Sequence, residues 1–135
     1  MRASLLAKQG DKAALGNLYN ELSRQAAKPD PAQRLLLGKI AEYLQRYAEA
    51  VNWYHSVPGG EELSEARLRA ANAQGLAGRQ DLALQEVHAI QSDATVDDDV
   101  RRDAYLLEAE LRQRADDLPG ELDALARGLA AYPDE

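Results

Sequence analysis

The chain has 135 residues, of which 45% are hydrophobic and only 5% aromatic, and it contains neither cysteine nor phenylalanine. These numbers exclude disulfides and thiolate metal sites, and they require a core built mainly from leucine and alanine, which favours closely packed helices over a sheet sandwich. The formal net charge is −7 and the pI is near 4.9, which argues against nucleic acid and anionic lipid as main partners.

The acidic residues gather in the second half of the chain. Residues 1–60 carry eight Lys and Arg against five Asp and Glu, whereas residues 61–135 carry eight against eighteen. An acidic surface suits a partner with a basic patch, although acidic side chains also serve to keep a surface hydrated. No apolar run reaches the roughly 20 residues of a membrane-spanning helix, so direct membrane insertion is not expected. The first residues lack the apolar stretch of a signal peptide.

Proline, glycine and polar clusters divide the sequence into eight expected helices. Lys28-Pro29-Asp30-Pro31 ends one helix and begins the next, because proline forbids continuation and Asp30 can cap a helix that has Pro31 in its first turn. Other breaks fall at residues 58–60, at Gly78 and over the polar segment 92–99. The expected helices are a short opening helix before Gly10 and helices over about 12–27, 32–45, 47–57, 61–77, 81–91, 100–115 and 118–131.

One sequence pattern returns after 33 residues: Ala50, Tyr54 and Val57 align with Ala83, Val87 and Ile90. In alanine- and leucine-rich sequence without strand signals, a repeat of this length predicts stacked pairs of antiparallel helices. The expected fold class is therefore all-α, an α-α superhelix of about 3.5 helix pairs with seven or eight helices. Small residues are expected where paired helices cross, with large ones filling the space beside them. The small residues are Gly38, Ala50, Ala71, Ala83 and Ala109, and the large ones are Tyr54, Val87 and Leu125.

The best-matched unit, residues 31–64, carries Leu37-Gly38 in its first helix and Tyr47, Ala50, Tyr54 and Val57 in its second. This pattern resembles the tetratricopeptide repeat (TPR) family. The resemblance implies one TPR-like domain over residues 1–135, with a partial unit at about 1–30 and units at about 31–63, 64–101 and 102–135. The last unit departs from the pattern, since Glu121 stands where the family has alanine. The family implies a non-catalytic scaffold or adaptor that binds another protein or peptide and needs no cofactor.

A longer run, residues 35–84, is similar to the TPR region of outer-membrane lipoproteins of proteobacteria. Members of that group face the periplasm, and some act as adaptors for a C-terminal processing protease. The chain has no lipobox cysteine, so this similarity implies a bacterial fragment of a larger protein. A periplasmic and a cytoplasmic location both remain open.

In the TPR family the first helices of the units line a groove that holds the partner. Counting repeat positions onto this chain predicts a candidate peptide-binding groove. Its residues are Leu35, Lys39, Glu42, Tyr43, Leu68, Asn72, Leu76, Leu106, Glu110, Gln113 and Arg114. One subclass of the family clamps a C-terminal carboxylate with basic residues. The matching positions here are Leu35, Lys39, Arg69, Asp103 and Leu107. Only Lys39 and Arg69 are basic and Asp103 would repel a carboxylate, so no carboxylate clamp is expected.

Other chemical constellations have structural explanations, and no catalytic or metal site is expected. His55 and His88 share a repeat position and are predicted to face solvent, too far apart for a shared ion. Residues 97–99 are three consecutive aspartates that lack the spacing of a calcium loop and are expected to cap the next helix. Glu108–Arg112 and Glu110–Arg114 read as surface ion pairs four residues apart.

The two remaining features are an aromatic cluster and an apolar stripe. Tyr47 and Tyr54 fall on core positions, whereas Tyr43 and Trp53 have no packing explanation from the pattern. The last expected helix carries Leu118, Leu122, Leu125 and Leu129, a stripe that a further helix would normally cover. The sequence therefore suggests either an excised segment or a homodimer through the last helix. In the second case the chain would serve as the assembly segment of a larger protein.

Overall fold

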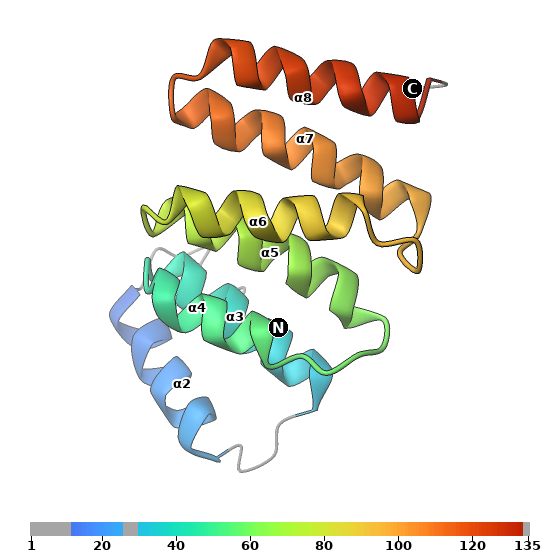
Figure 1. Ribbon diagram of the computed structural model, residues 1–135. Helices are drawn as coiled ribbons and strands as arrows, with labels where there is room; N and C mark the ends of the chain where they lie inside the picture. Colours follow the sequence, from blue (N-terminus) through green and yellow to red (C-terminus); the bar gives the residue numbers. More distant parts are fainter. Residues whose placement is uncertain (1–11, 26–29, 134–135) are drawn as a thin grey trace. The chain divides into compact units, whose positions relative to one another are not determined.

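The computed structural model describes residues 12–25 and 30–133 (Figure 1). All regular structure in these residues is helical, and within each unit helices that follow one another in the chain pack together, so the all-α helical repeat fold is confirmed. The expected opening helix before Gly10 lies outside the described residues. The chain forms two compact units, residues 1–66 and 67–135, and the boundary falls within helix α5 (Glu62–Leu76).

The first unit contains α2 (Lys12–Gln25), α3 (Pro31–Tyr43) and α4 (Tyr47–His55). Helix α3 begins where the sequence predicts, because the Asp30 carboxylate accepts a hydrogen bond from the Gln33 amide at 2.8 Å while the Gln33 side chain accepts one from the Asp30 amide at 2.9 Å. This reciprocal capping box, together with Pro31 at the first helical position, fixes the start of the helix. Helices α3 and α4 pack as a hairpin, and α2 packs against α3.

The predicted crossing of α3 and α4 is confirmed. Ala50 is fully buried, and the Tyr54 ring lies directly over Gly38. A Cβ atom added at Gly38 would come within 2.6 Å of Tyr54 Cδ1, so only glycine permits this close approach. Tyr47, by contrast, is half-buried rather than a full member of the core.

The second unit contains the rest of α5 and then α6 (Gln80–Gln91), α7 (Asp98–Arg114) and α8 (Leu118–Ala131). Helix α6 packs against α7, and α7 packs against α8. The helices approach closely because alanine dominates their contact faces, as the repeat pattern predicts. The core cluster comprises Ala71, Ala83, Val87, Ile90, Ala104 and Leu111, and Ala109 is also buried.

The links within the three helix hairpins repeat one turn. Gln45, Gly78 and Asp116 all have positive φ angles, of 63°, 82° and 57°. In each link the amide of the residue after the positive-φ position donates a hydrogen bond to the carbonyl five residues earlier, which is the pattern of a Schellman motif. The bonds join Arg46 N to Ala41 O at 2.8 Å, Arg79 N to Gln74 O at 2.9 Å and Asp117 N to Arg112 O at 2.9 Å. The backbone therefore repeats at the same 33-residue interval as the sequence between the first two links.

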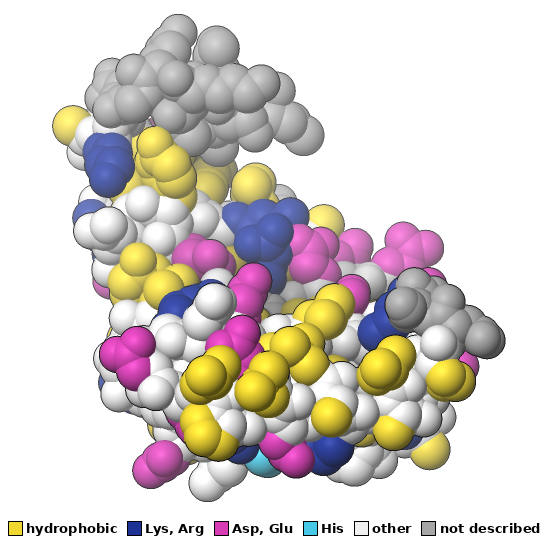
Figure 2. All heavy atoms as spheres, turned by 90° about the horizontal axis from the view of Figure 1, so that it is seen from above, with side chains coloured by type: hydrophobic (Ala, Val, Ile, Leu, Met, Phe, Trp, Pro, Cys, Tyr) yellow, Lys and Arg dark blue, Asp and Glu magenta, His cyan; other side chains and the backbone are white. Residues whose placement is uncertain are grey.

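The expected packing of Leu125 is wrong. Its side chain is 40% exposed, and the buried apolar residue of α8 is Ala124. Helix α8 packs against α7 on one side only, and no other described helix of the unit covers its outer face, where Leu125 lies. Figure 2 views the molecule from the side of α8 and shows hydrophobic side chains gathered in a row on this face.

Candidate functional site

The second unit contains a surface hollow of about 280 Å³ between α5 and α7. Four of the predicted groove residues, Leu68, Asn72, Leu106 and Glu110, line it. They meet because residues three or four apart on a helix share a face, and α5 and α7 present those faces to the same space. The other lining residues are Arg69, Asp103 and Leu107. The hollow is thus lined by three leucine side chains together with charged and amide groups.

Arg114, a further predicted groove residue, joins the two sides of this hollow. Its Nη2 donates to Asn72 Oδ1 at 2.7 Å and to Glu110 Oε2 at 3.2 Å. The Glu110–Arg114 pair was predicted, whereas the contact to α5 was not. Both charged side chains are largely exposed, so the ion pair itself adds little stability. What it does is hold three polar groups in fixed positions beside the leucines.

The first unit has its own hollow, of about 320 Å³, between α3 and the start of α5. Of the predicted groove residues, Leu35 and Lys39 line it. Lys39 Nζ lies 3.0 Å from Glu65 Oε2. The remaining lining residues are Ala32, Leu36, Glu61 and Glu62, so acidic groups outnumber the single lysine.

Besides Arg114, four predicted groove residues are absent from the lining of both hollows. Glu42 accepts a hydrogen bond from the Tyr54 hydroxyl at 2.6 Å. Tyr43 is 40% exposed, with Lys12 Nζ located 5.6 Å from its ring centre. Leu76 and Gln113 are exposed on the second unit. The sequence therefore identified the helices that line the hollows better than it identified individual positions on them.

A fully buried carboxylate on α7, Glu108, was not anticipated. The prediction of a surface Glu108–Arg112 pair is wrong, because Glu108 is 0% exposed and lies where α6, α7 and α8 meet. Its oxygens accept hydrogen bonds from Gln91 Nε2 at 2.9 Å, Arg112 Nε at 2.8 Å and Arg127 Nη2 at 2.7 Å. His88 Nε2 lies 3.3 Å away, so this histidine borders a buried charge and is not purely solvated as predicted.

The Glu108 cluster has a structural rather than an acid–base character. Burial alone would raise the pKa of the carboxyl, but the hydrogen bonds from Gln91, Arg127 and Arg112 outweigh burial and lower the pKa to about 2. The group is therefore ionised at neutral pH, with its oxygens occupied. A signal was available in the sequence, since Ala104, Glu108 and Leu111 recur at helical spacing and two of the three are apolar.

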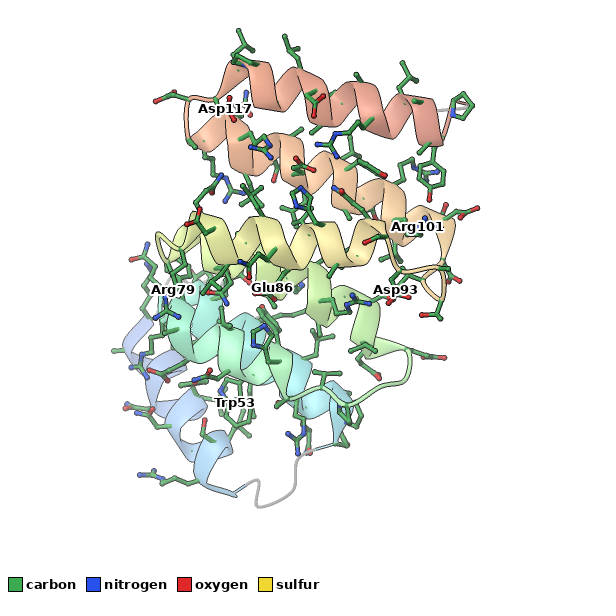
Figure 3. All side chains as sticks on the ribbon, in the orientation of Figure 1. Trp53, Arg79, Glu86, Asp93, Arg101 and Asp117 are labelled. Carbon is green, nitrogen blue, oxygen red and sulfur yellow. The ribbon has the colours of Figure 1, made fainter. Side chains whose placement is uncertain are left out.

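The structure explains Trp53, which the sequence pattern left unassigned. Trp53 lies on α4 and is labelled in Figure 3. Its Nε1 donates to the Tyr19 hydroxyl at 2.8 Å, and that hydroxyl donates to Glu49 Oε1 at 2.8 Å. Burial is the main cause that raises the pKa of Tyr19. These residues line an open hollow of about 460 Å³ beside α2 and α4. These hydrogen bonds join α2 to α4, so Trp53 has a structural role.

The aspartates at the start of α7 act differently from expectation. Asp97 occupies the N-cap position, but its side chain accepts no capping hydrogen bond. Asp98 and Asp99 instead face Arg101 at 4.0 Å and Arg102 at 3.1 Å. Nearby, Asp93 accepts bonds from Thr95 and Arg67, and these lower the pKa of its carboxyl to about 2. Among the described residues, no three His, Cys, Asp or Glu side chains are grouped to hold a metal ion.

No protein-family model matches this sequence, and no curated protein matches it. In the part of the chain that the structure describes, no helix combines the length and the apolar character needed to cross a bilayer.

Proposed function

We propose that this chain is a TPR-like adaptor domain that binds a polypeptide and performs no catalysis. The hollow between α5 and α7 is the main support for this proposal. Its lining combines leucine side chains with hydrogen-bonded polar groups, which is the composition of sites that anchor an apolar side chain and orient the chain around it. Leu106 is 53% exposed there, which leaves an apolar anchor point in contact with solvent beside the other leucines of the hollow.

The charges around the hollows indicate the chemistry of the peptide. In the second unit the lining residues Asp103 and Glu110 are acidic and Arg69 is basic, and Glu110 is already paired with Arg114, so this hollow has no excess of either sign. In the first unit, three glutamates accompany Lys39. A peptide with one large apolar side chain for the leucines and a flanking lysine or arginine for these glutamates complements the two surfaces. The acidic Asp103 disfavours a terminal carboxylate.

The similarity to the TPR regions of bacterial lipoproteins also supports a role as an adaptor. An adaptor holds a client chain for a partner enzyme, and it needs a binding surface but no reactive group. The buried Glu108 does not compete with this interpretation, because its low pKa and filled hydrogen bonds suit it to joining helices. Whether the protein works in the periplasm or the cytoplasm does not alter the proposal.

Selection from a random peptide library on the immobilised chain tests the proposal. Selected peptides should carry an apolar residue flanked by basic ones, and fluorescence polarisation should give a measurable affinity for the wild-type chain. Leu106→Asp should weaken binding at least tenfold, because it places a charge where the anchor sits. Leu82→Asp is the matched control, since Leu82 is 42% exposed and lies outside the hollow. Equal binding to the wild-type and Leu106→Asp chains would exclude this surface.

A further inference from the structure

The outer face of α8 carries a continuous stripe of exposed leucine. Leu118, Leu122, Leu125 and Leu129 are 60%, 56%, 40% and 59% exposed. Helix α8 faces α7 with its opposite side, where Ala124 is fully buried. The hydrophobic row in Figure 2 runs along this outer face. An apolar stripe along a whole helix is typical of an interface rather than of an isolated surface.

The leucines are spaced by four, three and four residues, which is the spacing of a helix-pairing seam. This spacing reads the same in both directions about the midpoint between Asp123 and Ala124. A second helix of the same sequence, laid antiparallel on the first, therefore matches leucine to leucine along the whole stripe. We propose that two copies of this chain associate through α8 in this antiparallel register, with Leu118 opposite Leu129 and Leu122 opposite Leu125.

Self-complementarity of this kind is what a two-fold symmetric dimer requires. The positions that flank the leucine seam also favour a symmetric dimer. Only one of the four positions 119, 121, 126 and 128 carries a charged residue, Glu121, so few charges of the two copies approach each other. The nearby charges Asp123 and Arg127 pair with each other at 2.8 Å. A partner of another sequence would need leucines at the same spacing. The positions that flank the seam offer no charge pattern that would select such a partner over a second copy.

The acidic residues decide between antiparallel and parallel pairing. Asp116, Asp117 and Glu121 all lie at the start of α8, whereas the described last turn carries no charged side chain. Parallel pairing would bring the acidic ends of both copies together. Antiparallel pairing separates these acidic helix starts by about 20 Å, the length of a 14-residue helix.

A hollow beside the stripe offers room for the second copy. It measures about 330 Å³ and is lined by Tyr105, Leu106, Leu125, Gly128, Leu129 and Tyr132, with Arg102 at its edge. In the antiparallel register Leu118 of the second copy lies opposite Leu129, at the level of this hollow. The exposed end of the leucine can enter this hollow and contact Tyr105 and Tyr132, whose rings pack edge to face. One helix pair buries less area than a standard interface, so the dissociation constant should be on the order of 100 µM.

Sedimentation equilibrium of the full chain tests the association. The average mass should rise from 14.8 kDa towards twice that value between about 10 µM and about 1 mM. Added salt should strengthen the dimer, because the second unit is acidic. Leu122→Lys should weaken it at least tenfold, and the control Leu82→Lys should not. Circular dichroism melting must show both variants folded. A monomer throughout the range, or a dimer indifferent to Leu122→Lys, would overturn the proposal.

Disulfide trapping tests the register. Because the chain has no native cysteine, only the introduced cysteines can form a cross-link. A mixture of Leu118→Cys and Leu129→Cys chains should form a cross-linked dimer, because these positions face each other. Leu118→Cys alone should not cross-link, since its two copies lie about 16 Å apart and a disulfide needs Cα atoms within about 7 Å. Self-cross-linking of Leu118→Cys would show parallel pairing and refute the register. Leu122→Lys should leave peptide binding unchanged, which separates this proposal from the adaptor proposal.

Discussion

Arg127 on α8 donates a hydrogen bond from Nη2 to Oε2 of Glu108 on α7, at 2.7 Å. The same carboxylate oxygen accepts a bond from Arg112 at 2.8 Å. Hydrogen bonds between ionised groups are stronger than neutral ones. They matter here because Ala124 is the one buried residue of α8, so apolar burial contributes little to this helix. The arginine–glutamate contacts therefore supply a substantial share of the attachment of α8 to α7.

Replacing Glu108 by alanine should lower the free energy of unfolding by about 2–3 kcal/mol. Removing one partner of a buried ion pair typically costs about 3–5 kcal/mol, and the lower value applies because Arg112 and Arg127 keep some contact with water. Urea unfolding followed by circular dichroism gives the measurement. Glu110→Ala is the matched control: Glu110 pairs with Arg114 at the surface, and its loss should cost less than about 0.5 kcal/mol. Equal effects of the two changes would contradict the structural role of Glu108.

The same carboxylate should make stability depend on pH in the acidic range. In the folded chain the pKa of Glu108 is about 2, against an ordinary value of 4.5. Its contribution is therefore complete above about pH 4.5 and is lost as the pH falls towards 2, because only the unfolded chain takes up a proton in that window. The wild-type chain should be more stable than Glu108→Gln at pH 7, and this difference should shrink below pH 4.5.

Urea unfolding of both chains from pH 7 to pH 2.5, at constant ionic strength, measures this difference. Asp93, whose pKa is also about 2, is present in both chains and accounts for acid sensitivity that remains in the Glu108→Gln variant. A difference between the two chains that stays constant down to pH 2.5 would show that the low pKa of Glu108 does not stabilise the fold.

The repeat pattern predicted the helices because each relevant signal is local. Asp30-Pro31 and the alanines at Ala50 and Ala83 act within one helix or one hairpin, and the structure confirms them. Helix α8 begins and ends at the expected residues, 118 and 131. Local propensity, capping and small-residue spacing are enough to specify such elements.

The burial of Glu108 could not be read from its immediate neighbours. Four residues from Arg112, it has the sequence spacing of a surface pair, and what buries it are Gln91 and Arg127 on two other helices. The prediction that Leu125 is packed is wrong for a related reason. In the repeat pattern a following helix would cover this position, and none of the described residues does so. The groove was predictable in part. The sequence indicated which faces of α5 and α7 line it, but the hydrogen bond between Arg114 and Asn72 depends on the distance between the two helices.

The three hairpin links provide a second stability prediction. Gln45 and Asp116 adopt positive φ angles that glycine reaches without strain, and the equivalent link already has Gly78. Gln45→Gly and Asp116→Gly should each raise the free energy of unfolding by about 0.5–1 kcal/mol, whereas Gly78→Ala should lower it by about 1–2 kcal/mol. Thermal melting of the three variants checks the signs. Destabilisation by both glycine substitutions would mean that side-chain contacts, rather than backbone strain, control these turns.

The contact between Gly38 and Tyr54 leads to the last prediction. Alanine normally stabilises a helix interior relative to glycine by about 1 kcal/mol, so Gly38→Ala would be favourable if space allowed. Here the added Cβ would lie 2.6 Å from Tyr54 Cδ1, and the ring cannot move away because it is only 2% exposed. Overpacking of this kind costs about 1–3 kcal/mol, which exceeds the gain in helix propensity.

Gly38→Ala should therefore destabilise the chain by about 1 kcal/mol in urea unfolding, against the direction that helix propensity alone predicts. Gly59→Ala is the matched control, because a Cβ there meets no atom within 4 Å and the change should have little effect. A neighbour without an aromatic ring should rescue the variant: in a Tyr54→Leu background, Gly38→Ala should become neutral or stabilising. If Gly38→Ala destabilises equally in both backgrounds, the Tyr54 ring is not what requires glycine at this crossing.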